Sequence, residues 1–368
     1  MFLEKLHLLN FKNYEEADLD LSPKINLFLG NNGVGKTNLL DALFYLAFCK
    51  SFFNPVDSQL IRQDQKFMVL QGSFHKNGKI ENIYCGLKKG QKKQFKKNKK
   101  PYERLADHIG FIPMVMISPS DSQLILEGSD VRRRFIDLII SQFNRSYLEH
   151  LIQYNRALSQ RNRLLKKFME VRKFDEAALE IWDEQLFRYG EPIFKARKEF
   201  IEDFVTLFQS HYQYISQQKE SVSLAYESQL NEVEFSKLII EHRDKDRRLT
   251  YSTAGVHKDD LVFEIKGMPL KKFGSQGQQK TFLLALKLAQ AEFLKNQMEV
   301  TPILLLDDIY DKLDNKRVEQ LMEVVQQDWF GQVFISDTHL ERLPKIFKEL
   351  KADFKSFHIQ NGKIYEQK

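Results

Sequence analysis

The sequence is poor in several features that mark whole classes of protein. It has only two cysteines, Cys49 and Cys85, too few for a disulfide framework or a zinc site, so we expect two free buried thiols in a reducing compartment. No apolar run approaches the length that crosses a bilayer, and residues 1–5 lack the layout of a secretion signal. Glycine and proline are also sparse, at 16 and 9 of 368 residues. These absences predict an ordinary globular protein that is cytoplasmic and has no membrane partner.

Length and charge limit the possible domain organisation and the possible partners of the protein. At 368 residues the chain can build one large domain with an insertion, or two domains. The formal net charge of +6 is modest, but eight lysines lie between Lys88 and Lys100. A local basic patch on a nearly balanced protein favours an anionic polymer as partner.

A phosphate-binding loop stands near the N-terminus. The apolar run 25–29 predicts a buried strand before it, and the apolar spacing after Lys36 predicts a helix behind it. Glycines let backbone N–H groups point at the phosphates of ATP, Lys36 neutralises their charge, and Thr37 offers its hydroxyl to Mg²⁺. A chance glycine-rich turn does not explain a match to G-x-x-x-x-G-K-[ST] at every fixed position. The loop residues are Gly30, Asn31, Asn32, Gly33, Val34, Gly35, Lys36 and Thr37.

Two carboxylates follow a second apolar run. Residues 303–306 precede Asp307 and Asp308, so both acids are predicted at the carboxyl end of a strand, where parallel α/β sheets bind ligands. We expect Asp307 to hold Mg²⁺ through water and Asp308 to orient or deprotonate the attacking water, which makes Asp308 and Lys36 the predicted catalytic residues. The alternative for Asp308 is a helix-capping or solvent-exposed carboxylate. Because aspartate reaches less far than glutamate, hydrolysis is expected to be slow.

A second turn that suits a phosphate lies far from the first. Ser275, Gln276, Gly277 and Gln278 open an amphipathic helix, and a helix N-terminus attracts anions. One nucleotide needs one phosphate loop, so the economical explanation is that this turn caps the ATP held by a second copy of the protein. The chain is therefore predicted to form an ATP-controlled homodimer. The alternative is an ordinary helix start with Ser275 as its cap. After this turn the sequence contains the two carboxylates Asp307 and Asp308 and then the run Lys312–Asp314.

Two groups of basic residues are candidates for contact with DNA phosphates. The first lies on a predicted β-hairpin that turns at Asn98, and the second precedes Phe135 in the run Arg132–Phe135. The alternative for the hairpin is that its lysines only keep an exposed segment soluble. The alternative for the arginines is a set of salt bridges within the protein. The candidate residues are Lys92, Lys93, Lys96, Lys97, Arg132 and Arg133.

Composition divides the chain into three segments. Residues 1–125 carry strand patterns around the phosphate loop, 126–220 nearly lack glycine and proline and show helical periodicity, and 221–368 return to sheet character. We predict an α/β fold with mixed β-sheets and helices, built from 1–125 and 221–368. An antiparallel helical lobe over 126–220 is inserted into it. The run Gln332–Ser336 is expected to be the last strand.

The order of the motifs resembles that of the bacterial RecF family over nearly the whole chain. The resemblance implies an ABC/SMC-type ATPase head with a helical lobe, which dimerises on ATP and binds gapped or junction DNA. It also implies cooperation with RecO and RecR in loading recombinase onto single-stranded DNA. The motifs that carry it are the phosphate loop with Asn38 behind it, Arg132–Phe135, Tyr154 with Gln160–Asn162, Gly255–Leu261, Gly274–Lys280 and Leu306–Asp308.

The resemblance also implies roles for single residues. Residues 30–37 would hold ATP, 275–278 would reach the γ-phosphate of the partner's ATP, and Asp307 and Asp308 would serve Mg²⁺ and hydrolysis. Gln276 stands where transporter-type signatures have a glycine. Asp337 and His339 both follow the predicted strand 332–336, and the sequence leaves open which of them is the switch residue. From the residues alone, the segment His257–Asp260 either organises the edge of the nucleotide site or forms a structural turn.

Other functions fit the motifs less well. A transporter ATPase subunit would bind a membrane partner through a small helical lobe, and a related nuclease would need an appended acidic metal domain. The main alternative is an ABC-type ATPase that acts as an ATP-switched assembly scaffold without direct DNA binding. Stimulation of ATP turnover by double-stranded DNA would separate a DNA-binding protein from this scaffold.

Overall fold

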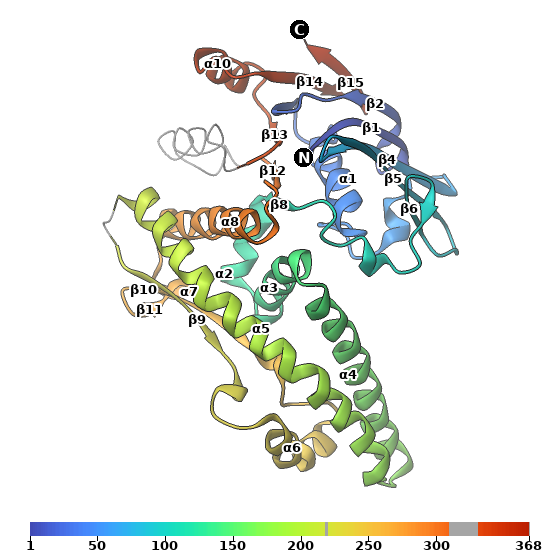
Figure 1. Ribbon diagram of the computed structural model, residues 1–368, viewed down its shortest axis with the longest axis vertical. Helices are drawn as coiled ribbons and strands as arrows, with labels where there is room; N and C mark the ends of the chain where they lie inside the picture. The colour runs from blue at the N-terminus through green and yellow to red at the C-terminus, as the bar shows by residue number, and fades with distance from the viewer. Residues whose placement is uncertain (218–219, 309–329, 368) are drawn as a thin grey trace. The chain divides into compact units, whose positions relative to one another are not determined.

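Figure 1 shows the computed structural model, which describes residues 1–217, 220–308 and 330–367. The chain forms two compact units, one from Met1–Asp121 with Leu286–Lys368 and one from Ser122–Ala285. The sequence predicted that the insertion ends at 220, whereas the second unit continues to 285. The difference arises because the strands after 220 pair with each other and pack on the helix before them. Lys312–Asp314 lies outside the described residues.

A mainly parallel sheet forms the centre of the first unit. Its strand order is β15-β14-β3-β13-β12-β8, and all neighbours are parallel except β15 on β14. Every residue of β3, β8, β12 and β13 is buried, which is why these strands read as continuous apolar runs. The strands are β3 (Ile25–Leu29), β8 (Met114–Ile117), β12 (Ile303–Leu306), β13 (Val333–Asp337), β14 (Phe354–Gln360) and β15 (Lys363–Gln367).

The prediction that the strand at 332–336 is the last one is wrong, because β14 and β15 follow β13. β14 lies directly beside β3, with Phe357 opposite Phe28. Polar residues of differing exposure alternate with apolar ones in its sequence, so it lacks the continuous apolar run that marks the other parallel strands. The C-terminal segment therefore completes the sheet that carries the phosphate loop.

The first unit also contains an antiparallel sheet of six strands, in the order β2-β1-β4-β5-β6-β7. The predicted hairpin turn is confirmed, because β6 and β7 pair across Asn98 and Lys99, whose φ angles of 50° and 69° are left-handed. The strands are β1 (Phe2–Phe11), β2 (Tyr14–Asp20), β4 (Phe67–Lys76), β5 (Lys79–Lys88), β6 (Gln94–Lys97) and β7 (Lys100–Pro101). The described helices of this unit include α1 (Lys36–Phe48) and α10 (Arg342–Glu349), with short 3-10 helices η1 (Asp57–Leu60), η2 (Leu105–Asp107) and η3 (Pro119–Ser122).

The interior of this unit contains both cysteines and a histidine. Cys49 and Cys85 are free and buried, as predicted. His108 is fully buried, with Nε2 at 2.6 Å from the carbonyl oxygen of Leu46 and Nδ1 at 3.1 Å from the Tyr102 hydroxyl. Burial lowers the pKa of His108 to about 4, so the folded protein holds this imidazole neutral.

Acidification is expected to destabilise this unit through His108. An unfolded histidine has a pKa of about 6.5, so between pH 6.5 and 4 the unfolded chain binds a proton that the folded chain excludes. The stabilisation is complete above pH 6.5 and is lost as pH falls, by up to about 3 kcal/mol at pH 4. Urea unfolding at several pH values measures it. His108→Asn should flatten the pH dependence and the exposed control His339→Asn should not; equal slopes for both would contradict the assignment.

The second unit consists of long helices and a small antiparallel sheet, in the order β11-β10-β9. The predicted helical lobe is confirmed, because α4 and α5 lie side by side, joined by residues 172–175 (Figure 1). The elements are α2 (Gln123–Leu126), α3 (Ser129–Phe143), α4 (Arg145–Val171), α5 (Glu176–Ser216), β9 (Val222–Glu227), η4 (Gln229–Asn231), α6 (Phe235–Leu249), η5 (Val256–Lys258), β10 (Asp260–Ile265), β11 (Met268–Pro269) and α7 (Leu270–Phe273). The boundary between the units falls within α8 (Gln276–Met298).

Buried ion pairs join the helices of the second unit. Arg197 on α5 is 2% exposed and contacts the carboxylates of Asp137 and Asp259, each at 2.8 Å. Arg161 on α4 is 1% exposed and contacts Asp183 and Asp246, each at 2.6 Å. A buried charge without a partner would be strongly destabilising, so these pairs specify how α3, α4, α5 and α6 pack.

Candidate nucleotide-binding site

The phosphate loop lies between β3 and α1, and its glycines adopt conformations that other residues avoid. Gly30, Gly33 and Gly35 have φ angles of 153°, 80° and 115°. A Cβ atom on Gly30 would lie 2.5 Å from the carbonyl oxygen of Ile359, and one on Gly35 would lie 2.8 Å from the Tyr14 hydroxyl. Glycine is therefore required at both ends of the loop, for backbone angle and for space.

The turn between β1 and β2 supports the loop from outside. Asn13 donates from Nδ2 to the carbonyl oxygen of Val34 at 2.9 Å, and the Tyr14 hydroxyl donates to that of Gly35 at 3.0 Å. Asn38, which follows the loop, donates to Asn13 Oδ1 at 2.7 Å. Sequence reasoning did not find Asn13 or Tyr14, because nothing in their local pattern indicates contact with a loop about twenty residues away.

Lys36 points back into the loop rather than into solvent. Its side chain is 3% exposed. Its Nζ donates to the carbonyl oxygens of Gly30 at 2.8 Å and Asn31 at 3.1 Å, and lies 3.9 Å from Asp308 Oδ1. The ammonium therefore sits within the curl of the loop, where a phosphate needs a positive charge.

Thr37, Asp307 and Ser336 meet at the carboxyl ends of the central strands. The Thr37 hydroxyl donates to Asp307 Oδ1 at 2.9 Å, and the Ser336 hydroxyl lies 2.8 Å from the same oxygen. The backbone N–H of Asp308 donates to Ser336 Oγ at 2.9 Å. Ser336, at the end of β13, was not among the predicted site residues. It is found only when β13 is placed beside β12.

The oxygen atoms gathered here suit Mg²⁺. Burial raises the pKa of Asp307, against the hydrogen bonds from Ser336 and Thr37 that lower it. A buried carboxylate of this kind gains a compensating charge when a divalent cation binds, and hydroxyl and carboxylate oxygens are the ligands that Mg²⁺ prefers. Asp308 has a left-handed φ of 42°, an unusual backbone conformation of the kind that clusters at functional sites. These residues therefore fit the metal that a phosphate loop requires.

The two candidates for the switch residue differ in their surroundings. Asp337 is 2% exposed and accepts from Arg342, with Nη2 at 2.6 Å and Nε at 3.0 Å. Its carbonyl oxygen accepts from the backbone N–H of Gly30 at 3.2 Å, which connects β13 to the first residue of the phosphate loop. His339 is exposed. Asp337 thus has a structural link to the loop.

The second predicted phosphate-binding turn starts α8 in the second unit. Gln278 donates its backbone N–H to Ser275 Oγ at 3.3 Å, and its Oε1 accepts from the Ser275 N–H at 2.7 Å, which is a capping box. Gln278 also donates from Nε2 to Glu220 at 2.5 Å. Ser275 and Gln276 are exposed. The capping role of Ser275 is therefore present, and the outer face of the turn is accessible.

Comparison with known proteins shows the family to which this chain belongs. The family model described as RecF/RecN/SMC N terminal domain matches residues 2–359. A DNA replication and repair protein RecF from Phocaeicola vulgatus is 54% identical over 370 residues, covering 100% of this chain and 99% of the relative. The chain belongs to the RecF family. Two solved structures of the recombination mediator protein RecF in the RecFOR pathway, RecF-ATPrS and RecF-ATP, are 29% and 28% identical, each with a TM-score of 0.90 and covering 100% of this chain and 98% of theirs.

The fold is therefore that of the RecF and SMC ATPase heads, as the motif order predicted. The RecF-family motif at Gly255–Leu261 forms a hydrogen-bonded turn inside the second unit. His257 Nδ1 lies 2.7 Å from the Tyr154 hydroxyl and Nε2 lies 3.0 Å from the carbonyl oxygen of Ser252. Burial lowers the pKa of His257 to about 4. These contacts account for His257–Asp260 as a structural turn, one of its two interpretations.

The lysines of this RecF-family chain differ in what they contact. Lys93 donates to the carbonyl oxygen of Cys49 at 2.5 Å and pairs with Asp57 at 2.7 Å, so its charge is used within the unit. Lys96 lies over the Tyr84 ring and Lys97 over the Phe111 ring, at 5.3 and 4.5 Å from the centroids. Lys92 is exposed, as are Lys88, Lys89, Lys99 and Lys100. The exposed charge of the hairpin therefore lies mostly outside the four lysines first chosen.

Both candidate arginines are held by contacts within the second unit. Arg132 forms a paired contact with the carboxylate of Asp260, at 2.7 and 2.8 Å. Arg133 donates to Ser129 Oγ and to the carbonyl oxygen of Asp259, both at 2.6 Å. Burial lowers the pKa of Arg133. These are the salt bridges and hydrogen bonds of the alternative interpretation, and the arginines here attach α3 to the start of β10.

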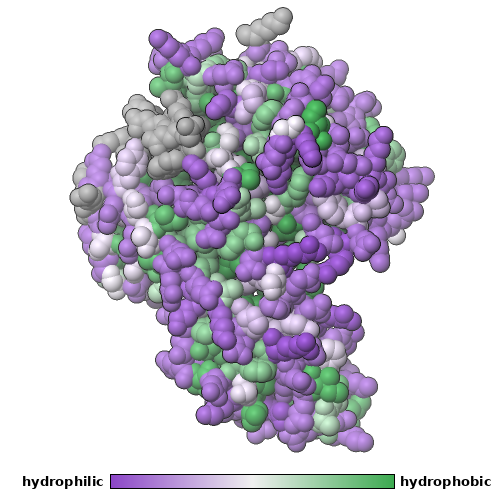
Figure 2. All heavy atoms as spheres, in the orientation of Figure 1, coloured by the Kyte–Doolittle hydropathy of each residue, from purple (hydrophilic) through white to green (hydrophobic). Residues whose placement is uncertain are grey.

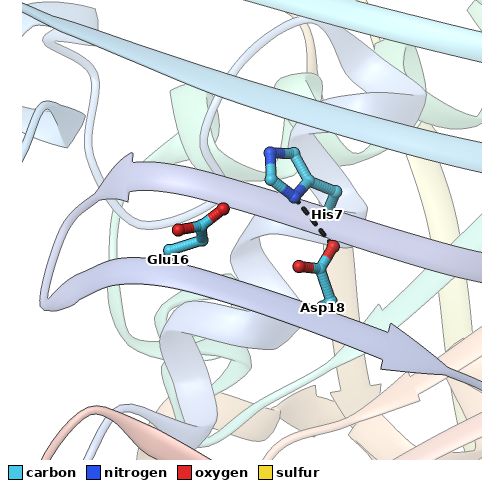
Figure 3. Close-up of side chains that lie close together, drawn as sticks. All are labelled: His7, Glu16 and Asp18. Carbon is cyan, nitrogen blue, oxygen red and sulfur yellow. Dashed lines mark hydrogen bonds and ion pairs between the residues drawn. The ribbon is translucent and has the colours of Figure 1, made fainter.

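A set of possible metal ligands also lies on β1 and β2, where His7, Glu16 and Asp18 share one face of the sheet (Figure 3). His7 Nδ1 lies 2.8 Å from Asp18 Oδ1. Glu16 and Asp18 are exposed. The contact between the His7 imidazole and the Asp18 carboxylate accounts for the geometry, and we assign the three residues no part in nucleotide binding.

The described helices include none with the length and apolar character that a membrane span needs.

Proposed function

We propose that this chain is an ATP-dependent DNA-binding protein of recombinational repair and replication. The observation that supports it most strongly is the convergence of Thr37, Asp307 and Ser336 beside a complete phosphate loop, in a chain of the RecF family. One relative is named a DNA replication and repair protein, and a solved structure is that of a recombination mediator protein with ATP. Nucleotide binding is the chemistry for which these residues are arranged.

Each residue of the site has its own role in binding or hydrolysing ATP. Lys36 exchanges its carbonyl partners for phosphate oxygens, and the loop N–H groups hold the remaining oxygens. Thr37 and Asp307 would hold Mg²⁺, which neutralises phosphate charge when bound. Asp308, 3.9 Å from Lys36 Nζ, orients the attacking water. Its short side chain makes ATP turnover slow, so that ATP acts chiefly as a switch of assembly.

The exposed turn at Ser275–Gln278 is the partner-facing half of the switch. Two copies bring this turn against the γ-phosphate of each other's ATP, so that the dimer forms only when nucleotide is bound. The closed dimer then binds gapped or junction DNA. Together with RecO-type and RecR-type mediator proteins, it helps to load recombinase onto single-stranded DNA.

Exposed lysines at the end of β5 and between β5 and β6 provide the test of DNA binding. Replacing exposed Lys88, Lys89 and Lys92 by alanine should lower the slope of log affinity against log salt by roughly 2 to 3 units, because each phosphate contact contributes about 0.9. The measurement is a salt titration of duplex DNA affinity with a non-hydrolysable ATP analogue. The control removes three exposed lysines elsewhere in the same unit, Lys5, Lys24 and Lys79, and should leave the slope unchanged. Parallel lines for all three proteins would remove Lys88, Lys89 and Lys92 from the DNA interface.

A second candidate function, the ATP-switched scaffold without direct DNA binding, has one observation in its favour. Lys93, Arg132 and Arg133 are all engaged within the protein. The scaffold predicts no DNA affinity in the titration above and no rise of ATP turnover with double-stranded DNA. The DNA-binding function predicts both.

A further inference from the structure

A pocket in the second unit lies apart from every residue used above. It has a volume of about 690 Å³ and is formed where the C-terminal end of α4 meets α6. Leu165, Phe168 and Phe174 give it an apolar lining. Its remaining lining includes four basic residues, among them Arg172 and Arg248, and one acidic residue. A pocket lined by both apolar and basic side chains suits a ligand with both apolar and acidic groups.

The positive charge of the pocket is not neutralised by its neighbours. The acids at the start of α5 and on its first turns, Glu176 and Asp183, pair with Arg243. Among the described residues, no ion pair involves Arg172 or Arg248. The ion pair of Arg247 is with the exposed Asp244, at 3.4 Å, a contact of little energetic value in water. A negatively charged ligand would therefore face four basic residues of the lining against a single acidic one.

Large apolar side chains are exposed at the same place. Met169 is 65% exposed and Val171 is 56% exposed, both on the last turn of α4. Figure 2 shows hydrophobic residues between hydrophilic ones at this end of the second unit. Exposed apolar groups that adjoin a pocket and are bordered by charge are typical of a protein-binding surface.

The contacts within the pocket favour a peptide over single-stranded nucleic acid, which binds by stacking its bases on aromatic rings. The guanidinium of Arg247 lies 3.9 Å from the centre of the Phe174 ring. Phe168 meets the same ring at 5.2 Å with an interplanar angle of 74°. One face of the Phe174 ring is thus already covered by Arg247. Met169 and Val171 are not aromatic, so a base cannot stack on them. We propose that this pocket binds an acidic segment of a partner protein that carries one large apolar side chain.

The test uses a synthetic peptide as the probe, on the full chain. A fluorescein-labelled peptide with five aspartates around one phenylalanine should bind the wild type, as measured by fluorescence anisotropy. Replacing its phenylalanine by serine should weaken binding at least about tenfold, since the apolar part of the pocket would stay empty. The double variant Arg172→Glu with Arg248→Glu should also bind at least about tenfold more weakly, because attraction becomes repulsion.

The matched control is Lys166→Glu with Lys167→Glu, which makes the same change of charge on exposed positions of α4 outside the pocket. It should keep the wild-type affinity within about twofold. Equal losses in the two double variants would mean general charge attraction and would overturn the proposal. The proposal would also be overturned if the wild type did not bind the peptide. The same holds if the wild type bound a single-stranded oligonucleotide instead of the peptide, and the Arg172→Glu with Arg248→Glu variant lost that binding.

Discussion

Replacing Lys36 by methionine is expected to weaken ATP binding by about 100-fold while the protein stays folded. A hydrogen bond to a charged group contributes about 1.5 to 3 kcal/mol, and each 1.4 kcal/mol corresponds to a tenfold change in affinity. The Lys36 ammonium is 3% exposed and already lies inside the loop, so it needs little rearrangement to contact phosphate. Equilibrium binding of a fluorescent ATP analogue measures the effect.

The control for this experiment is Lys355→Met. Lys355 lies on β14 beside β3, but its charge pairs with Glu366 at 3.2 Å, away from the loop. Its replacement should leave ATP affinity unchanged. In Lys36→Met, the carbonyl groups of Gly30 and Asn31 lose a donor, which lowers the melting temperature by a few degrees. Wild-type ATP affinity in Lys36→Met would remove the role assigned to this lysine.

Ser275→Arg is expected to abolish ATP-dependent dimers without changing how a single copy binds nucleotide. Ser275 is exposed at the start of α8, where an arginine would occupy the space intended for the γ-phosphate held by a second copy. The phosphate loop belongs to the first unit, so ATP affinity should persist. Light scattering with and without ATP distinguishes monomer from dimer.

Two further variants make the dimer test specific. Asp175→Arg replaces another exposed N-cap of the second unit, whose side chain accepts from the Ala178 N–H at 3.1 Å, and should dimerise normally. Asp308→Asn should do the opposite of Ser275→Arg and accumulate ATP-bound dimers, because water activation is lost while binding remains. A Ser275→Arg protein that dimerises on ATP would refute the idea that this turn contacts the partner's nucleotide.

Local patterns in the sequence predicted the elements that carry nucleotide chemistry. The strand at 25–29 and the helix from Lys36 are found where they were expected, because a buried parallel strand has an unbroken apolar run and the loop requires its glycines. The pair Asp307–Asp308 stands at the end of β12 for the same reason. β14 was missed, because its pattern of polar and apolar residues is that of a partly exposed strand.

Long side chains were the least predictable part of the candidate site. Eight lysines in one segment look alike in the sequence, yet Lys93 turns inward to Asp57 and Lys92 stays exposed. Which of them is exposed depends on β5, β6 and η1 being adjacent, and no local pattern contains that information. Arg132 is a similar case, since its partner Asp260 is 128 residues away.

By itself, the sequence determined the phosphate loop and thereby predicted nucleotide binding, since eight contiguous residues build the loop and their backbone angles are a local property. It also determined the family, through motifs spread over its length. Only the tertiary structure decided that Ser336, Asn13 and Tyr14 belong to the site, and that the second unit extends to 285. The physical reason is distance along the chain: the hydrogen bond from Thr37 to Asp307 spans 270 residues, and it forms because parallel strands bring their carboxyl ends to one edge of a sheet.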